Sequence, residues 1–364
     1  MLEVGNVRNP HLTINLDAIT YNASKVREIC HARGIRADSV VKCVCGDIKI
    51  AEAILEGGIY SLMDSRMKNI AAFRKAGIKA PLGLLRIPML SELTEMLSYA
   101  DWSLISMAET IIELEKLCAS RKREFDVLLM TDIGDLREGI WPDRIGEMAD
   151  LFRKCVWVRC VGAGTNLGCF GGVMPSEENL KMLVRISSEL ERTIERKDWL
   201  TSGGGTNLFY AMLNSDITPP EINHLRIGGA LLRGQCGTDV IKELRQDAFI
   251  LTAEYVEIAR KPSKPVGPTG TDAFGKVPHF EDRGMRYRAI AAVGKQDVIP
   301  EDLTPLTRGV TVLGASSDHL VLDIDDADPR PEMGERLDFS FRRYGGLLQA
   351  FNSDYIERVY VRDR

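Results

Sequence analysis

SVVKCV, residues 39–44, is the first of eight short apolar runs that alternate with amphipathic stretches along most of the chain. The others are YSLMD (60–64), PLGLLRI (81–87), WSLISM (102–107), FDVLLMTDI (125–133), VWVRCVGAG (156–164), WLTSGGG (199–205) and HLRIGGA (224–230). Each run is continuous and rich in valine, isoleucine and leucine, which is typical of parallel strands buried on both faces.

The stretches between these runs have the period of helices, as in residues 176–197, where apolar residues recur at i, i+3, i+4 and i+7. Eight strands that alternate with helices predict an α/β fold, a closed (β/α)₈ barrel. An open doubly wound sheet is the alternative, but the sequence has no glycine fingerprint of a dinucleotide-binding fold.

The pattern changes near residue 245. Strand-like runs separated by Gly, Pro and Asp turns follow, with little helix between them, which predicts a separate, mainly β domain. We expect the barrel at residues 12–240 and the β domain at residues 1–11 and 241–364. HLTINL (11–16) reads as a further strand that could pair with the β domain.

Composition excludes several classes of protein. The 364 residues are 45% hydrophobic and 27% charged, as in globular proteins, and a net charge of −5 gives no reason to expect nucleic acid or an anionic membrane as partner. Apolar runs are too short to span a membrane, and the opening residues lack the pattern of a signal peptide. The eight cysteines form neither a disulfide framework nor a metal-ligand pattern. We therefore expect a cytoplasmic protein without a metal site.

Lys42 is the first candidate for chemistry, because it is flanked by valines in an apolar run and a buried lysine must be paired or desolvated. Desolvation lowers the pKa of an amine and suits it to Schiff-base formation. The alternative is a lysine at the barrel mouth that pairs with Asp47 or Asp64. Both readings remain open from the strand alone.

Two arginines and two glycine runs lie at later strand ends. Arg137 follows the fifth run and Arg226 lies in the eighth; either alone would most often be a surface or salt-bridged arginine. TSGGGTNLF (201–209) reads as a strand, a glycine run and a helix start, whose backbone N–H groups could bind an anion. A second glycine pair follows Arg226, and the last two strands are where barrels commonly bind phosphate.

The order and spacing of ten segments give the chain a resemblance to a known family. They are VVKCVCGD (40–47), LMDSRMKNI (62–70), LLRIPMLSE (84–92), DIGDLREG (132–139), GAGTNLGCFGGV (162–173), LRIGG (225–229), DAFG (272–275), VGKQDV (293–298), LGASSDHLVLD (313–323) and YGGLLQAFNSDYIERVY (344–360). The chain resembles the ornithine racemase-type branch of amino-acid racemases, which are related to alanine racemase. The resemblance implies a pyridoxal 5′-phosphate (PLP) barrel, a free amino acid as substrate and a homodimer.

The resemblance also implies roles for individual residues. Lys42 would hold PLP as a Schiff base and act as one catalytic base. Arg137 would hydrogen-bond the phenolic oxygen of PLP, and Arg226 would face its pyridine nitrogen. Asn166 falls where alanine racemases place a histidine against the ring. The expected phosphate contacts are Gly205, Thr206, Gly229 and Tyr344.

Two positions depart from alanine racemase. Lys295 stands in VGKQDV where alanine racemases have a tyrosine from the partner subunit, and it is either the second catalytic base or a lysine on the rim. Asp318 falls where related decarboxylases hold the distal ammonium of a diamine, and it either binds substrate or caps a turn. A cationic substrate such as ornithine or lysine is therefore expected.

Other functions of the same fold are the alternatives: a decarboxylase, an aldolase, a dehydratase, a racemase of small neutral amino acids, or a PLP-binding protein without turnover. An arginine at the ring nitrogen argues against decarboxylation. A dehydratase would need a zinc site that the β domain does not offer. A non-catalytic PLP-binding protein would be a single barrel.

Overall fold

The computed structural model describes residues 7–363 and divides into two compact units. The barrel unit is Ala18–Gln246. The β unit combines the described residues of Met1–Asp17 and Asp247–Arg364, so both ends of the chain contribute to it. The sequence-based division differs by a few residues: 12–17 lie in the β unit, and 241–246 lie in the barrel unit.

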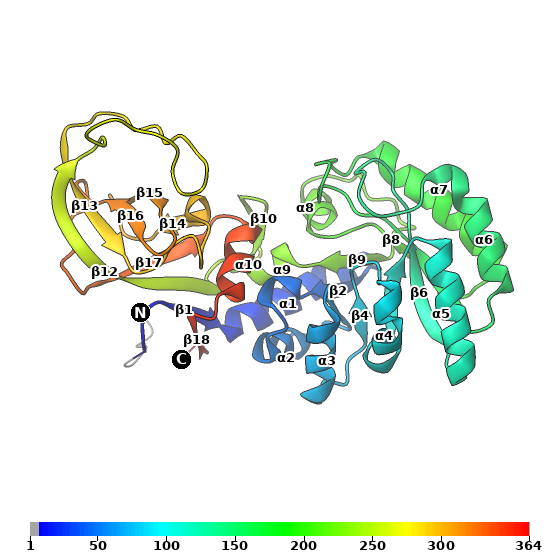
Figure 1. The fold of residues 1–364 in the computed structure, drawn as a ribbon. Helices are drawn as coiled ribbons and strands as arrows, with labels where there is room; N and C mark the ends of the chain where they lie inside the picture. Colours follow the sequence, from blue (N-terminus) through cyan, green and yellow to red (C-terminus); the bar gives the residue numbers. More distant parts are fainter. Residues whose placement is uncertain (1–6, 364) are drawn as a thin grey trace. The chain divides into compact units, whose positions relative to one another are not determined.

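Within the described residues, eight parallel strands close into a barrel (Figure 1). They are β2 (Arg36–Val40), β3 (Leu62–Asp64), β4 (Leu82–Leu84), β5 (Trp102–Ile105), β6 (Phe125–Met130), β7 (Val158–Gly164), β8 (Leu200–Ser202) and β9 (His224–Ile227). Pairing of β2 with β9, in the register Ala37↔Leu225, completes the circle. The expected barrel is thus confirmed, because each apolar run contributes one strand.

Helices follow the strands and lie around the outside of the barrel (Figure 1). They are α1 (Leu16–His31), α2 (Ile48–Glu56), α3 (Met67–Lys75), α4 (Leu93–Tyr99), α5 (Ala108–Arg121), α6 (Ile145–Lys154), α7 (Glu177–Ile194), α8 (Thr206–Asn214) and α9 (Gly229–Arg233). The helical period predicted at 176–197 corresponds to α7. Ser176 caps α7 by accepting a hydrogen bond from the Asn179 backbone N–H.

Buried apolar side chains from several strands pack together in the barrel. Trp102, Met63 and Leu104 belong to one buried apolar cluster there. A Cβ atom at Gly83 would lie 2.6 Å from the Trp102 ring, so the neighbouring strand needs glycine at this place. The interior is therefore a packed core, and functional groups are left to the ends of the strands.

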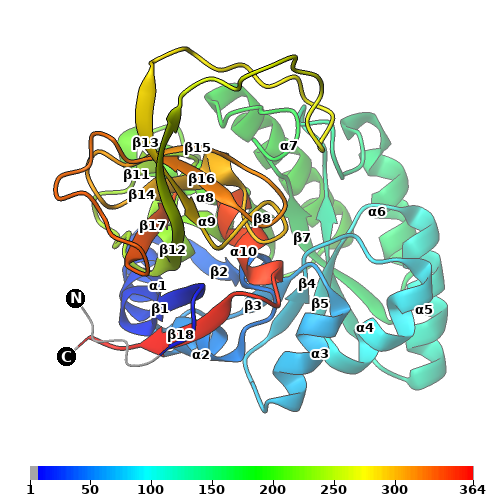
Figure 2. The same ribbon diagram turned by 60° about the vertical axis from the view of Figure 1, so that its left-hand side comes forward.

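The β unit is built on one eight-stranded sheet within the described residues. Its strands are β1 (His11–Asn15), β12 (Phe249–Pro262), β13 (Met285–Ala291), β14 (Leu303–Pro305), β15 (Thr311–Ala315), β16 (Leu320–Asp323), β17 (Arg336–Phe341) and β18 (Glu357–Val361). One helix, α10 (Tyr344–Asn352), lies between β17 and β18. Strand β1 runs antiparallel to β12 and parallel to β18. Figure 2 shows β12 and β13 side by side with the long loop that joins them.

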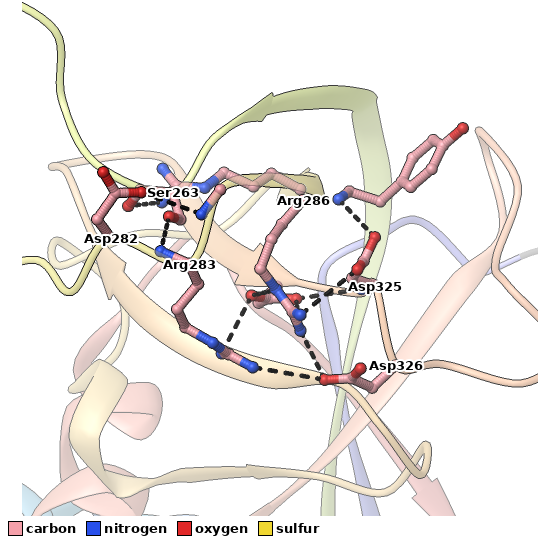
Figure 3. Close-up of polar contacts among 10 residues, drawn as sticks. Ser263, Asp282, Arg283, Arg286, Asp325 and Asp326 are labelled. Carbon is pink, nitrogen blue, oxygen red and sulfur yellow. Dashed lines mark hydrogen bonds and ion pairs between the residues drawn. The ribbon is translucent and has the colours of Figure 1, made fainter.

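Ion pairs join β13 to the end of β16 and to the turn that follows it (Figure 3). Arg286 on β13 donates two hydrogen bonds to Asp323 on β16, of 2.7 and 3.0 Å, and a third of 2.6 Å to Asp326. Asp325 lies 3.4 Å from the same guanidinium, and Arg283 adds longer ion pairs to Asp323 and Asp326. Strand β13 and the turn after β16 are thereby held together by charge.

Candidate active site

Lys42 lies where the carboxyl ends of the barrel strands meet, but it is not inside a strand. β2 ends two residues earlier, and Lys42 begins the short 3₁₀ helix Lys42–Val44. The prediction of a mid-strand lysine is therefore wrong, because the chain must already turn to enter α2. Cys45 and Gly46 make that turn with φ angles of +51° and +75°. Asp47 then caps α2 by accepting a 3.1 Å hydrogen bond from the Ile50 N–H.

The Lys42 side chain is half-buried, and within residues 7–363 its ammonium has no hydrogen-bond or ion-pair partner. Pairing with Asp47 or Asp64, the alternative from the sequence, is not observed. Asp64 is buried at the end of β3, and its Oδ1 accepts hydrogen bonds from the backbone of Arg66 and the amide of Asn69. Burial raises the pKa of Asp64 to about 6.

Arg226, on β9, is 3% exposed and is held by neutral groups. Its guanidinium donates to the Ser202 hydroxyl, to the Thr165 carbonyl at 2.6 Å and to Asn166 Oδ1 at 2.9 Å. Its Nε is buried without a partner, and no carboxylate of the described residues pairs with it. Burial lowers the pKa of Arg226 to about 10. The guanidinium thus retains one donor without a partner.

A chain of hydrogen bonds continues from Arg226 into the barrel. Ser202 Oγ lies 2.9 Å from His224 Nδ1, and His224 Nε2 lies 2.9 Å from Asp38 Oδ2. Burial lowers the pKa of His224, so the ring is neutral at pH 7 and carries one proton. Because Asp38 only accepts, that proton is on Nε2, and Nδ1 accepts from Ser202. The hydroxyl oxygen is then free to accept from Arg226.

A second chain of hydrogen bonds runs towards the barrel mouth. Asn166 accepts from Arg226 and donates through Nδ2 to Glu138. Glu138 in turn pairs with Arg137, with one hydrogen bond of 2.6 Å and a second contact at Nε. The structure therefore brings Arg137, Asn166 and Arg226 together. The two arginines are joined through an amide and a carboxylate.

Asp135 fixes the two loops that carry these groups. Its carboxylate accepts four backbone hydrogen bonds, of 3.0–3.2 Å, from residues in the loop after β7. Burial, the largest single influence, raises the pKa of Asp135, but the four N–H donors together outweigh it and the pKa is lowered. The loop that bears Arg137 is thus tied to the loop that bears Asn166.

Two helix N-termini, those of α8 and α9, follow the last two strands. The N-cap residues Gly205 and Gly228 have no side chain to cap the first N–H groups. A Cβ atom at Gly205 would lie 2.6 Å from the Arg226 carbonyl oxygen, so the close approach of the two strand ends requires glycine. The Thr206 hydroxyl accepts a 3.2 Å hydrogen bond from the Ala230 N–H and links the two helices. This arrangement presents N–H groups suited to an anion.

Lys295 lies in the β unit, in the segment after β13. Its Nζ is 3.9 Å from Asp272 Oδ2 and 3.8 Å from the centre of the Phe274 ring. Its backbone N–H donates to the Ser316 carbonyl at 2.9 Å, so this segment lies beside the β15–β16 turn. The side chain is 21% exposed.

Asp318, in that turn, accepts hydrogen bonds through Oδ1 from Ser316, Ser317 and His319. These contacts match the turn-capping alternative considered from the sequence, while Asp318 stays 60% exposed. They lower the pKa of Asp318, the Ser317 hydroxyl most strongly. Tyr344 is the first residue of α10, also in the β unit.

Comparison with known proteins relates this chain to amino-acid racemases. The family model described as "Alanine racemase, N-terminal domain" matches residues 14–235. A lysine racemase of Thermotoga maritima is 41% identical, over 96% of this chain and 98% of its own length. An ornithine racemase of Acetoanaerobium sticklandii is 35% identical, over 96% and 99%. The chain belongs to the alanine racemase family. Its fold matches that of a solved Streptomyces lavendulae alanine racemase, with a TM-score of 0.75, 17% identity and 98% of each chain covered.

The resemblance to the ornithine racemase-type branch of this family is therefore confirmed. Two absences complete the description of residues 7–363. No group of three or more His, Cys, Asp and Glu side chains could hold a metal ion there. In the same residues, no helix has both the length and the apolar character needed to cross a membrane.

Several groups around Arg226 were not anticipated from the sequence. Ser202, His224 and Asp38 form the inner chain of hydrogen bonds, and Glu138 forms the outer one. One signal was available: His224 and Arg226 are two residues apart on one strand, so both side chains point to the same face. The contacts of Glu138 had no such signal, because they depend on how two loops meet.

Proposed function

We propose that this member of the alanine racemase family is a PLP-dependent racemase that interconverts the L and D forms of lysine or ornithine. The two relatives that match it over nearly their full length are named for racemisation of these amino acids. One observation of the structure carries the proposal: Arg226 is buried among neutral acceptors and its Nε has no partner.

The described residues fit PLP. The Lys42 ammonium has no partner in residues 7–363, as a lysine reserved for a covalent bond to a cofactor requires. Gly205, Thr206 and Gly229 would hold the phosphate at the paired helix N-termini, with Tyr344 as a further contact. When bound, PLP supplies an electron-withdrawing ring that stabilises negative charge at the substrate Cα.

Arg226 would select the reaction. A guanidinium only donates hydrogen bonds and stays protonated, so a ring nitrogen held against Arg226 would have to accept. Neutral groups surround Arg226, and the nearest carboxylates in its hydrogen-bond chains, Glu138 and Asp38, lie beyond Asn166 and His224. An unprotonated ring withdraws electrons less strongly, which favours rapid return of a proton to Cα over decarboxylation, aldol cleavage or dehydration. Arg137 would orient the phenolic oxygen, and Asn166 would lie against the ring.

Two lysines would move the proton. Lys42 would take or return it at Cα from one side of the substrate, and Lys295 from the other. A lysine base must lose its own proton, which neighbouring positive charge promotes. Asp318 is the carboxylate that the sequence offers for the distal ammonium of the substrate.

The direct test is chiral chromatography of the products formed from each L-amino acid by the PLP-loaded enzyme. We expect D-lysine or D-ornithine to form with the highest kcat/KM. Preference for alanine or serine would contradict the substrate class. Release of CO₂, ammonia or an aldehyde without racemisation would contradict the reaction. A PLP-binding protein without turnover would give no product at all.

We also propose a homodimer in which the β unit of one subunit supplies Lys295 to the barrel of the other. Exposed apolar side chains in the loops after β6 and β7 support a face that a second chain covers; they are Leu136, Trp141, Phe170 and Met174. Light scattering at the assay concentration tests the state, and an active monomer would contradict it. Mixing Lys42→Ala with Lys295→Ala subunits should restore about one quarter of the sites if they are shared.

The location we propose is the cytoplasm. Cys30, Cys118, Cys160 and Cys236 are buried thiols that form no disulfide. Unpaired thiols in this number are typical of a reducing compartment and support the proposal. Burial raises the pKa of Cys160 to about 12, so this thiol is unreactive. Fractionation of the source cells, with an antibody against the protein, tests the location; recovery from an oxidising compartment would contradict it.

A further inference from the structure

The DAFG segment (272–275), which no proposed role uses, forms a place for a positive charge in the β unit. Asp272 Oδ2 lies 3.9 Å from the Lys295 Nζ, and the Phe274 ring centre lies 3.8 Å from the same atom. A carboxylate and an aromatic face are the two kinds of group that attract an ammonium. In the structure, that ammonium belongs to Lys295.

The turn around Asp272 fixes the direction of its carboxylate. Oδ1 accepts hydrogen bonds from the backbone N–H groups of Phe274, at 2.9 Å, and Lys276, at 2.8 Å. Gly275 allows this tight turn with a φ of +76°. The N–H of Lys276 is the strongest of several influences that lower the pKa of Asp272. The carboxylate is therefore ionised at neutral pH, and its second oxygen is left to a cation.

Lys295 is held there only loosely. A separation of 3.9 Å is an ion pair but is too long for a hydrogen bond. The two side chains are 21% and 31% exposed, and ion pairs near solvent contribute little to stability. Another ammonium that reached Asp272 at hydrogen-bond distance would bind more strongly than Lys295 does. The place can thus exchange one ammonium for another.

We propose that Asp272 and Phe274 form the subsite for the distal ammonium of a cationic amino-acid substrate, the place that Lys295 occupies in this structure. The inference rests on the proposed function, in which Lys295 exchanges a proton with the substrate Cα. An amino acid whose Cα lies against the Lys295 Nζ has its side chain within reach of the groups around that atom. Arrival of the substrate ammonium displaces Lys295, which is then free to act at Cα.

Asp318 is the competing carboxylate, and the structure favours Asp272 over it. Oδ1 of Asp318 receives three side-chain donors from its own turn, and no aromatic ring contact is found for it among the described residues. It is 60% exposed, against 31% for Asp272. Asp272 alone of the two already holds an ammonium.

The test compares substrates that differ only in charge. The PLP-loaded enzyme is assayed with L-lysine and with 6-hydroxynorleucine, which has a hydroxyl in place of the ammonium. Asp272→Asn keeps the oxygen that caps the turn and removes the charge. We expect kcat/KM for lysine to fall about tenfold to a hundredfold, with less than about twofold change for 6-hydroxynorleucine. Phe274→Leu should cost lysine about two- to fivefold.

Asp282→Asn is the matched control, because Asp282 is an exposed carboxylate of the same loop. It should leave kcat/KM unchanged for both substrates. Equal losses on both substrates after Asp272→Asn would overturn the inference, because Asp272 would then act through Lys295 or the loop. Loss of lysine selectivity only in Asp318→Asn would assign the subsite to Asp318. If Asp272→Asn fails to fold, Phe274→Leu provides the test: its kcat/KM should fall more for L-lysine than for 6-hydroxynorleucine, and equal losses would overturn the inference. Failure of the proposed function is separate, since the unmodified enzyme would then prefer neutral amino acids.

Discussion

Two arginines, one in each unit, are both shielded from solvent but have opposite surroundings. Arg286 in the β unit, 11% exposed, is bonded to Asp323 and Asp326 and lies close to Asp325 (Figure 3). Hydrogen bonds to Asp323 and then Asp326 raise the pKa of Arg286. Arg226 in the barrel has only neutral acceptors, and burial lowers its pKa to about 10.

The buried carboxyl groups repeat this contrast. Burial, the largest single influence, raises the pKa of Asp323, but the hydrogen bonds from Arg286 and from the Asp325 N–H, together with the positive charges of Arg286 and Arg283, outweigh it, and the pKa is lowered. Asp64 in the barrel has no such cation at hydrogen-bond distance, and burial raises its pKa to about 6. One oxygen of Asp64 is buried without a partner.

We infer that the difference separates groups that stabilise the fold from groups that serve the proposed site. Arg283 and Arg286 in the β-unit cluster are paired with three carboxylates, so loss of these pairs should lower the stability of the protein without affecting the chemistry. Charged groups in the barrel mouth are desolvated and incompletely paired, which costs stability and is typical of functional sites.

The largest effect is expected at Lys42, the barrel cation without a partner. Lys42→Ala should reduce racemisation to the background rate, because no other described amine is placed at the end of β2. The free energy of unfolding of the PLP-free protein should change by less than about 0.5 kcal/mol, since no contact of the ammonium is lost. Urea unfolding and borohydride reduction followed by mass spectrometry measure both. PLP still fixed to the variant would refute the assignment.

Arg286→Met should show the reverse behaviour. Its removal leaves the buried Asp323 without the cation that hydrogen-bonds it and with only the longer ion pair to Arg283, so we expect a loss of about 3 kcal/mol of unfolding free energy. The folded fraction should keep its kcat. Arg283→Met is the control: this side chain is 46% exposed and its ion pairs are long, so the loss should stay under about 1 kcal/mol. If the folded fraction of Arg286→Met had a clearly lower kcat, Arg286 would affect the chemistry as well as the stability, and the contrast between the two arginines would be wrong.

Asp64 predicts a dependence of stability on pH. Its folded pKa of about 6 lies above its ordinary value of 3.8, so between these values the folded state binds more protons than the unfolded state. The contribution of Asp64 to the free energy of unfolding therefore increases as the pH falls from 7 to 4, by at most about 3 kcal/mol.

Urea unfolding of the PLP-free protein at pH 7.5 and pH 5, compared with Asp64→Asn, isolates this contribution. The comparison is needed because His224, whose pKa is lowered, changes stability in the opposite direction in the same range. The same pH dependence in protein and variant would show that Asp64 does not titrate there.

The smallest effect is expected at Ser202, which joins Arg226 to His224. Ser202→Ala leaves a guanidinium N–H and the His224 Nδ1 without their partner, which costs about 1–3 kcal/mol of stability. Racemisation should fall less than in Lys42→Ala, because Arg226 keeps its bonds to Thr165 and Asn166. Thermal unfolding and kcat/KM measure the two effects. Unchanged stability would show that the hydrogen bonds from Arg226 through Ser202 to His224 do not hold the guanidinium in place.

The sequence predicted the barrel well because each strand has its own local signal, a short apolar run between helical periods. It placed Arg226 and the glycine run before α8 at strand ends for the same reason. The sequence placed Lys42 inside the first barrel strand, whereas the strand ends two residues before it. The turn that follows depends on a positive φ at Cys45, and cysteine gives no sequence signal for that conformation.

Contacts between distant loops were the part that sequence patterns could not supply. Asp135 joins two loops more than thirty residues apart, and no periodicity marks such a pair. The roles of Asn166 and Glu138 follow from that junction. Lys295 likewise meets Phe274 only because the loop after β12 folds back on the segment after β13.

The pairing of β1 with β18 has a consequence for how the protein is made. His11 lies opposite Glu357 in the sheet, so the ribosome must synthesise the chain as far as β18 before the two strands meet. The barrel unit, Ala18–Gln246, has all its strands much earlier and can fold while translation continues. Until β18 is made, the edge of β1 that pairs with it stays open to other chains. We therefore expect completion of the β unit to be the late, aggregation-sensitive step of folding.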